Sequence, residues 1–142
     1  LMTDESIQKI CSLLGIETEK RERQVARVLC SGGNNAKRRF EYKTIQTCNA
    51  VSGLFNTNLE CSYGCLGMGD CVRICPFDVI YMDDNNLPVI DSEKCTGCGK
   101  CVAICPKNII KLISADKNIY IACSSHDRGP IVIKACKTGC IG

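Results

Sequence analysis

Aromatic side chains are scarce in this sequence of 142 residues, because Phe, Tyr and Trp together make up 5% and Trp is absent. So few large side chains leave little material for an extensive apolar core. No run approaches the roughly 18 consecutive apolar residues of a membrane-spanning helix, and the N-terminus lacks the basic and apolar segments of a signal peptide. We therefore expect one modest domain or two small ones, with no direct membrane insertion, in a reducing cytosolic compartment.

A large excess of charge of one sign is also lacking. The formal net charge of +3 is too small to indicate binding to nucleic acid. The single histidine, His126, has no nucleophile pattern near it and is more typical of a surface or turn residue than of a catalytic one. No Gly-rich phosphate loop and no flavin or nicotinamide fingerprint is present. The sequence therefore predicts no catalytic residues.

Cysteine is what the sequence has in abundance, with 14 residues, about one position in ten. That level is typical of a disulfide scaffold or of a metal protein, and a reducing compartment favours metal or redox chemistry. The run Cys95-x2-Cys98-x2-Cys101-x3-Cys105-Pro106 is the pattern of bacterial ferredoxins. In that pattern the closely spaced thiolates bind one [4Fe–4S] cluster, and the cysteine before proline binds the other.

An internal repeat extends this pattern upstream, because residues 71–76 (CVRICP) match residues 101–106 (CVAICP). In the first copy, however, Met68 stands where the second cysteine of a C-x2-C-x2-C run would fall. Cys61 is the nearest replacement, since it lies one helical turn before Cys65. The predicted ligands are Cys61, Cys65, Cys71 and Cys105 for cluster 1, and Cys75, Cys95, Cys98 and Cys101 for cluster 2.

Three alternatives remain open for these cysteines. Without Cys61, the first site would hold a three-cysteine [3Fe–4S] cluster. C-x2-C pairs also occur in four-cysteine zinc sites, although the third cysteine and the Cys-Pro ending favour iron-sulfur. A disulfide framework is the least compatible with such dense spacing and with the absence of a signal peptide.

The sequence assigns no single role to the remaining cysteines. Cys30, Cys48 and Cys123 are interpreted as buried structural thiols, with a disulfide, or a ligand to a cluster completed outside this sequence, as the alternative. Residues 136–142 (CKTGCIG) echo residues 61–67 (CSYGCLG), so we expect Cys136 and Cys140 to begin a further cysteine module.

The periodicity of apolar residues and the turn signals predict an α+β protein. We expect a helix over 3–15 capped by Thr3, a strand over 25–29, a helix over 47–55, a hairpin of 79–82 with 88–90, and a second hairpin of 109–113 with 119–122. The predicted organisation is an N-terminal helix and charged linker (1–24), a small α/β segment (25–57), a pseudo-twofold two-cluster ferredoxin domain (58–113), and a C-terminal hairpin with a cysteine-containing tail (114–142).

Beyond the ferredoxin pattern, the sequence resembles one family in particular. Residues 61–71 (CSYGCLGMGDC), followed by the Cys-Pro-Phe ending and the Cys95 motif, resemble the B subunits of Rnf complexes. The likeness continues in residues 28–32 (VLCSG), 40–43 (FEYK) and 122–127 (ACSSHD), so it covers most of the chain from about residue 25.

This resemblance implies a component of a membrane-bound, ion-translocating ferredoxin:NAD oxidoreductase. That component would lie at the cytoplasmic face of the membrane, accept electrons from soluble ferredoxin, and relay them through [4Fe–4S] clusters to other subunits. Members of the family usually also carry an N-terminal membrane helix and further cysteine clusters. The alternative hypothesis is a free-standing ferredoxin-like carrier that serves soluble oxidoreductases. In either case, the basic run Lys37-Arg38-Arg39 is a solvated face or a docking point for an acidic electron carrier.

Overall fold

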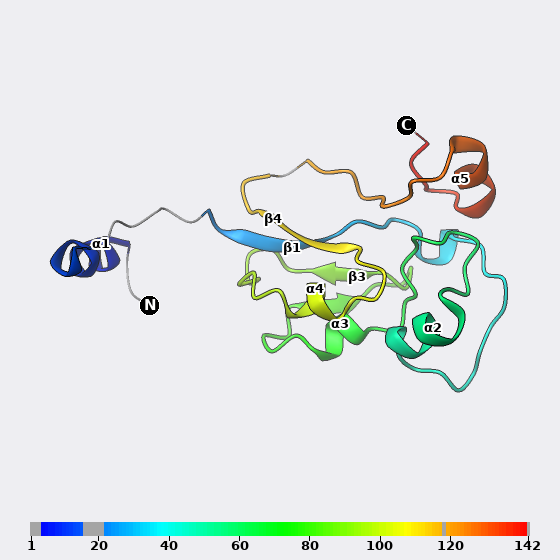
Figure 1. The fold of residues 1–142 in the computed structure, drawn as a ribbon, viewed down its shortest axis with the longest axis horizontal. Coiled ribbons are helices and arrows are strands. Elements are labelled where there is room, and N and C mark those ends of the chain that lie inside the picture. The colour runs from blue at the N-terminus through cyan, green and yellow to red at the C-terminus, as the bar shows by residue number, and fades with distance from the viewer. Residues whose placement is uncertain (1–3, 16–21, 118, 142) are drawn as a thin grey trace.

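A computed structural model describes residues 4–15, 22–117 and 119–141 of the chain (Figure 1). Its elements, in chain order, are α1 (Asp4–Leu14), β1 (Gln24–Val28), the 3-10 helix η1 (Gly33–Asn35), α2 (Cys48–Phe55), α3 (Asp70–Arg73), β2 (Ile80–Met82), β3 (Pro88–Ile90), α4 (Lys100–Ile104), β4 (Ile110–Ser114) and α5 (Gly129–Ala135). The predicted α+β class is confirmed, with short helices and short strands interspersed along the chain.

Strands β2 and β3 form the predicted hairpin, with Ile80 opposite Ile90 in an antiparallel register. The Asp83 side chain organises the connecting turn. Its Oδ1 accepts hydrogen bonds from the backbone N–H groups of Asn85 (3.0 Å) and Leu87 (2.7 Å). Asx turns of this kind hold a reversal of the chain without help from other elements, which is why the sequence pattern alone located this hairpin.

The second predicted hairpin does not form. Strand β4 instead pairs antiparallel with β1, from far upstream, with Val28 opposite Ile110 and Gln24 opposite Ser114. Val25 is completely buried by this pairing, whereas Ile119, in the expected partner strand, is 95% exposed. Burial of apolar surface therefore favours the long-range pairing over the local one.

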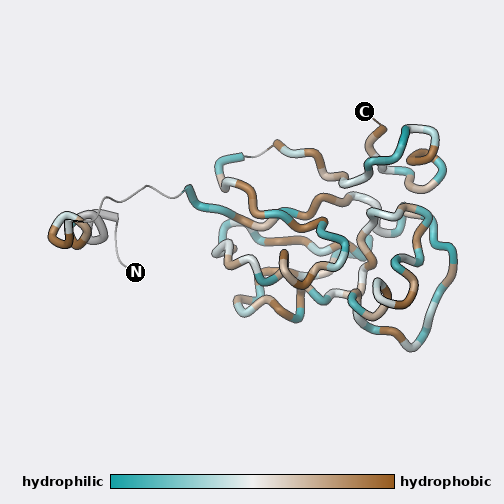
Figure 2. Tube along the Cα trace, viewed as in Figure 1, coloured by the Kyte–Doolittle hydropathy of each residue, from teal (hydrophilic) through white to brown (hydrophobic). Residues whose placement is uncertain are grey.

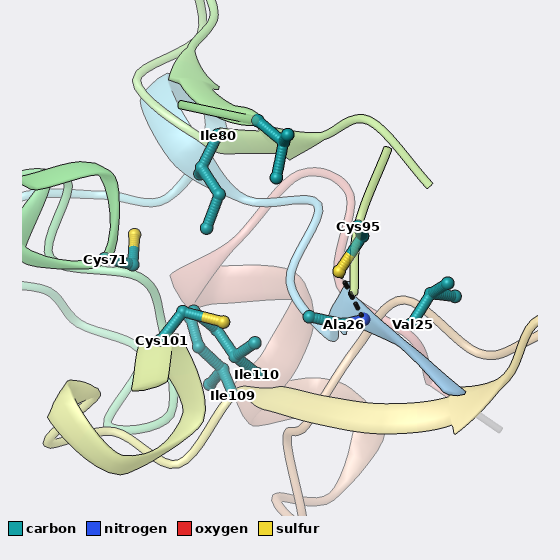
Figure 3. Packing of buried hydrophobic residues seen from close by; sticks show 9 residues of the cluster. Val25, Ala26, Cys71, Ile80, Cys95, Cys101, Ile109 and Ile110 are labelled. Carbon is teal, nitrogen blue, oxygen red and sulfur yellow. Dashed lines mark hydrogen bonds between the residues drawn. The ribbon is translucent and has the colours of Figure 1, made fainter. Parts of the chain in front are cut away.

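The main core lies between the two small sheets and helices α3 and α4 (Figure 3). Its buried members include three cysteines beside the aliphatic side chains: Val25, Ala26, Cys71, Val79, Ile80, Cys95, Cys101, Ile109 and Ile110. Because Val25 and Ala26 of β1 belong to this core, the core crosses the predicted domain boundary between residues 57 and 58. The segment that carries the ferredoxin pattern is completed by a strand from outside it.

Helix α1 agrees with the predicted N-terminal helix, whereas its proposed cap Thr3 and most of the charged linker lie outside the described residues. Figures 1 and 2 show the helix, with its hydrophobic C-terminal half, lying away from the other elements. Leu13 and Leu14 are accordingly 86% and 65% exposed. Among the described residues, no helix has both the length and the apolar character needed to cross a bilayer.

Candidate metal centres

Site 2 is a cavity lined by the four cysteines that the sequence assigned to cluster 2: Cys75, Cys95, Cys98 and Cys101. Three of the thiols come from the loop that leads into α4 and from α4 itself, and the fourth follows α3. Gly97 and Gly99 in the loop have φ values of +67° and +77°, a conformation that favours glycine. The local C-x2-C-x2-C spacing thus brings three thiols to one cavity because the backbone turns tightly between them.

Strand β1 covers site 2 from the side. The backbone N–H of Ala26 points to Sγ of Cys95 at 3.5 Å (Figure 3). Hydrogen bonds from backbone amides to thiolate sulfur are among the features that set the potential of iron-sulfur centres. The Gly97 backbone lies directly against the carbonyl oxygen of Gln24, so closely that a Cβ at this position would collide with it. β1 is therefore part of the wall of site 2.

Site 1 is a second cavity, which is lined by Cys48, Cys65, Cys71 and Cys105. Three of these cysteines were expected at cluster 1. The fourth differs from the expectation, because Cys48 occupies the place that the sequence reasoning gave to Cys61. Lys107 also lines this cavity, where burial lowers the pKa of its ammonium group.

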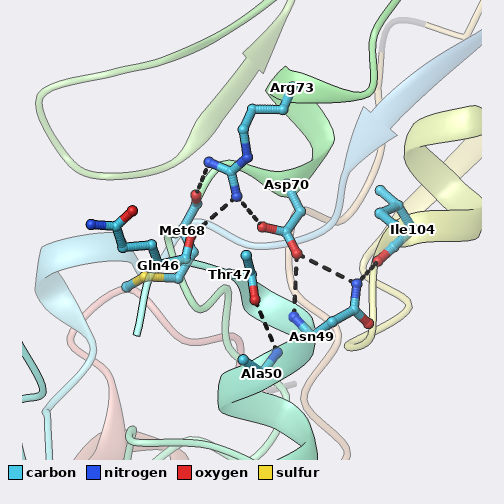
Figure 4. A network of polar contacts seen from close by, with 8 residues as sticks. All are labelled: Gln46, Thr47, Asn49, Ala50, Met68, Asp70, Arg73 and Ile104. Atoms are coloured by element: carbon cyan, nitrogen blue, oxygen red, sulfur yellow. Dashed lines mark hydrogen bonds and ion pairs between the residues drawn. The ribbon is translucent and has the colours of Figure 1, made fainter. Parts of the chain in front are cut away.

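Helix α2 places Cys48 at site 1. Thr47 caps the helix by accepting a hydrogen bond from the backbone N–H of Ala50 (3.2 Å), so Cys48 is the first residue of the helix. The buried carboxylate of Asp70 accepts hydrogen bonds from the backbone N–H (3.2 Å) and the side-chain amide (3.4 Å) of Asn49, and it also pairs with Arg73 (Figure 4). This network fixes the start of α2 against α3, which carries Cys71.

Because Met68 stands where a ferredoxin has a cysteine, the sequence indicated that a fourth thiol must come from elsewhere in the chain. Burial raises the pKa of Cys48, while the nearby backbone of Asp70 and Met68 lowers it, so Cys48 lies beside the position where a ferredoxin has its own cysteine. Spacing along the chain favoured Cys61 because it lies close to Cys65 in sequence. Cys48 lies much further upstream and is brought in only by the docking of α2, which no local pattern encodes.

Cys61 lies in a different cavity, together with Cys30, Cys123 and Cys136. Two further cysteines, Cys11 on α1 and the exposed Cys140, line neither site 1 nor site 2. All fourteen cysteines are free thiols, so the disulfide framework considered above is not formed.

The donor set of sites 1 and 2 fits an iron-sulfur cluster. Burial raises the pKa of the Cys65 and Cys71 thiols to about 12 and also raises the pKa of Cys48 and Cys101. Such thiols ionise only beside compensating positive charge, which an iron core provides. Across the part of the chain that the structure describes, no group of three or more Cys, His, Asp or Glu side chains is arranged around a single ion.

Comparison with known proteins gives the same assignment. Residues 59–109 match the 4Fe-4S dicluster domain. The chain is 36% identical over 139 residues to the B subunit of the ion-translocating oxidoreductase complex of Methanosarcina acetivorans, which covers 97% of this chain and 53% of that protein. It is 41% identical over 134 residues to the B subunit of the proton-translocating ferredoxin:NAD(+) oxidoreductase complex of Clostridium ljungdahlii, covering 94% of this chain and 47% of that protein.

A third relative is also the B subunit of an ion-translocating complex. The B subunit of the Na(+)-translocating ferredoxin:NAD(+) oxidoreductase complex of Acetobacterium woodii is 38% identical over 132 residues, which is 92% of this chain and 40% of that protein. The chain thus spans about half the length of the relatives it matches. The resemblance drawn from the sequence is confirmed: over nearly its whole length this chain is homologous to the B subunits of Rnf-type ion-translocating oxidoreductase complexes, and it contains a 4Fe-4S dicluster domain.

Proposed function

We propose that this chain relays single electrons within an ion-translocating ferredoxin:NAD oxidoreductase complex, using one [4Fe–4S] cluster at site 1 and one at site 2. A bound [4Fe–4S] cluster supplies reversible one-electron redox chemistry. The observation that carries the proposal is the crossing of ligands between the sites. Cys71 of α3 lines site 1 and Cys75 after it lines site 2, while Cys101 of α4 lines site 2 and Cys105 after it lines site 1. The two sites are therefore held at a short, fixed separation.

Matching backbone conformations in the two halves support this pairing, and we propose that the halves are related by a pseudo-twofold. Residues separated by thirty positions have matching backbone conformations. Gly67 and Gly97 have φ of +75° and +67°, Gly69 and Gly99 have +73° and +77°, and Asp78 and Asn108 have +52° and +53°. The same offset relates the cysteines of α3 to those of α4. We infer that the halves present two equivalent cluster pockets, with Cys48 replacing the thiol lost at Met68.

The side chains around the sites limit access of water while leaving routes for electrons. Leu66, Ile109 and Ile110 at site 1 and Val79 and Ile80 at site 2 are buried and apolar. Cys98, by contrast, is exposed. An exposed ligand gives a soluble donor such as ferredoxin a short path to site 2, so we place the entry of electrons there. The chain would then work at the cytoplasmic face of the membrane, in contact with other subunits.

The first test is the iron and acid-labile sulfide content of protein purified without oxygen, with EPR of the reduced sample. We expect at least about eight irons per chain and a spectrum showing interaction between two neighbouring clusters. Mixing with a reduced bacterial 2[4Fe–4S] ferredoxin should then bleach the visible absorption of the oxidised clusters. Zinc in place of iron, or no reaction with the reduced ferredoxin, would overturn the proposal.

A pull-down from native membranes solubilised in detergent distinguishes the proposed membrane complex from the alternative, a free-standing carrier. A tagged copy of the natural full-length protein should co-purify with integral membrane subunits. Recovery in the soluble fraction alone, with its iron retained, would favour the free carrier.

A further inference from the structure

The cavity that contains Cys61 has the features of a third metal centre, which we call site 3. It is lined by four cysteines that come from four separate segments of the chain: Cys30, Cys61, Cys123 and Cys136. Site 3 has the same number of thiols as each of the two ferredoxin sites.

We propose that Cys30, Cys61, Cys123 and Cys136 bind a third iron-sulfur cluster, of the [4Fe–4S] type. The proposal goes beyond the electron relay through sites 1 and 2, and it needs only that the chain is an iron-sulfur protein. None of the four cysteines belongs to a C-x2-C-x2-C run, so the ferredoxin pattern does not include them. Their convergence is a property of the folded chain.

Specific contacts hold three of the four segments, those of Cys30, Cys123 and Cys136, together around site 3. Cys30 and Cys123 face each other in an isolated antiparallel bridge, and Ala36 and Cys136 form another. Side-chain hydroxyls strengthen the junctions: Ser31 Oγ donates to the Ala122 carbonyl (3.1 Å). Ser124 Oγ donates to the Leu29 carbonyl (2.8 Å), and Thr138 Oγ1 to the Ser31 carbonyl (2.7 Å). The thiols are therefore positioned by the surrounding backbone rather than gathered by chance.

Hydrogen-bond donors are directed at the sulfur atoms of site 3, as at site 2. The backbone N–H of Cys65 donates to Cys30 Sγ (3.4 Å), and that of Cys140 donates to Cys123 Sγ (3.5 Å). Thr138 Oγ1 lies 3.5 Å from Cys136 Sγ, but its proton is donated to the Ser31 carbonyl. Amide donors stabilise thiolates, which is the form that binds iron. Two of the four sulfurs thus have a donor suited to a charged ligand.

Glycine makes the approach of the backbone to site 3 possible. A Cβ at Gly32 would lie 3.3 Å from Cys136 Sγ and 3.6 Å from Cys30 Sγ, and so would intrude between two of the thiols. A Cβ at Gly64 would lie 2.7 Å from the Leu59 side chain, next to Cys61. The loops around site 3 therefore leave space at the thiols that any larger residue would fill.

The test identifies the cysteines that bound iron protects from alkylation in the complete protein, which is purified without oxygen. A thiol-alkylating reagent is applied before and after removal of iron with a chelator, and the modified cysteines are identified by mass spectrometry of peptides. We expect Cys30, Cys61, Cys123 and Cys136 to react only after chelation. Cys11 is the internal control, because it lines none of the three sites and should react at once. Immediate reaction of all four site 3 cysteines in protein that retains its iron would overturn the proposal.

Iron content and variants give a second, independent measurement. Residues 1–142 of the wild type should account for about twelve irons, and Cys30→Ala or Cys123→Ala should lower the iron content by about four, with the EPR signal of the ferredoxin pair unchanged. Cys11→Ala should leave the iron content unchanged. If the variants fold poorly, native mass spectrometry of the wild-type protein still counts its clusters directly. About eight irons in the wild type, zinc bound at the four thiols, or a Cys30–Cys123 disulfide would each refute site 3 while leaving the proposed function intact. Absence of iron altogether would refute both.

Discussion

The backbone N–H of Cys65 donates a hydrogen bond to Sγ of Cys30, with 3.4 Å between nitrogen and sulfur. Cys65 lines site 1 and Cys30 lines site 3, so this single contact joins the walls of the two cavities. The two cavities are also connected along the chain, because Cys61 lines site 3 and Cys65 lines site 1. The segments of α3 and α4 likewise contribute cysteines to both site 1 and site 2, so site 1 is connected to each of the other two cavities.

Replacing Cys48 should damage site 1, whereas replacing Cys61 should not. In a Cys123→Ala background that lacks site 3, we expect Cys48→Ala to lower the iron content from about eight to between four and seven per chain, because one of the four thiols is lost. Cys61→Ala in the same background should leave about eight. EPR of the oxidised protein checks for a [3Fe–4S] signal in the first variant. The opposite result would restore Cys61 as the fourth ligand of cluster 1.

Gly97→Ala should be more harmful than Gly99→Ala, although both glycines have positive φ. A Cβ at Gly99 meets only Leu112, at 3.9 Å, so Gly99→Ala should cost about 1–2 kcal/mol from backbone strain alone. A Cβ at Gly97 would also collide with the Gln24 carbonyl and push β1 away from site 2. Denaturant unfolding and iron content measure both effects. Equal losses in the two variants would mean that β1 does not form the wall of site 2.

Asp70→Ala should loosen the docking of α2. The substitution leaves the Asn49 N–H groups and the Arg73 guanidinium without their shared acceptor, at a cost of about 1–3 kcal/mol. Because the same contacts hold Cys48 at site 1, we expect iron loss from site 1 and retention at site 2. Ser92→Ala, at a half-buried loop residue whose side chain makes none of these contacts, serves as the control for stability. Uniform loss of iron from every site in Asp70→Ala would indicate general unfolding instead.

Lys107→Gln should shift the reduction potential of site 1 to a more negative value. Its ammonium group lines the cavity, and positive charge near a cluster stabilises the reduced, more negative state. Lys111→Gln is the charge-matched control, because Lys111 is exposed on β4. Redox titration followed by EPR gives both potentials. A shift of the same size in Lys111→Gln would assign the effect to net charge rather than to position.

The four cysteines that the sequence assigned to cluster 2 line one cavity, because their positions depend on local geometry. Three of these thiols lie within seven consecutive residues, and the fourth follows from the repeat that ends in Cys-Pro. Three of the four thiols that line site 1 were assigned to cluster 1. The position of the fourth, Cys48, depends on a buried carboxylate that fixes a separate helix, and the sequence pattern does not reveal such a contact.

A long-range contact also accounts for the incorrect prediction of the second hairpin. A turn does follow β4, where the Lys117 N–H donates to the Ser114 carbonyl (3.1 Å). The local signal was therefore real, but the partner strand was decided by burial of β1 against the core. The sequence did not predict site 3 for a related reason. Its four cysteines are separated by long intervals and meet only through backbone bridges.

Strand pairing between β1 and β4 also governs the order of events during synthesis. All eight cysteines of sites 1 and 2 lie between the two strands in the chain. Domains fold as the chain emerges from the ribosome, so β1 remains unpaired until the segment that contains all eight cysteines has been synthesised. A nascent chain that stops before residue 110 presents eight thiols with no closed sheet over them. We therefore expect iron-sulfur assembly in the cell to follow completion of the cysteine motifs, because β4, which pairs with β1, is the last part of the core to be translated.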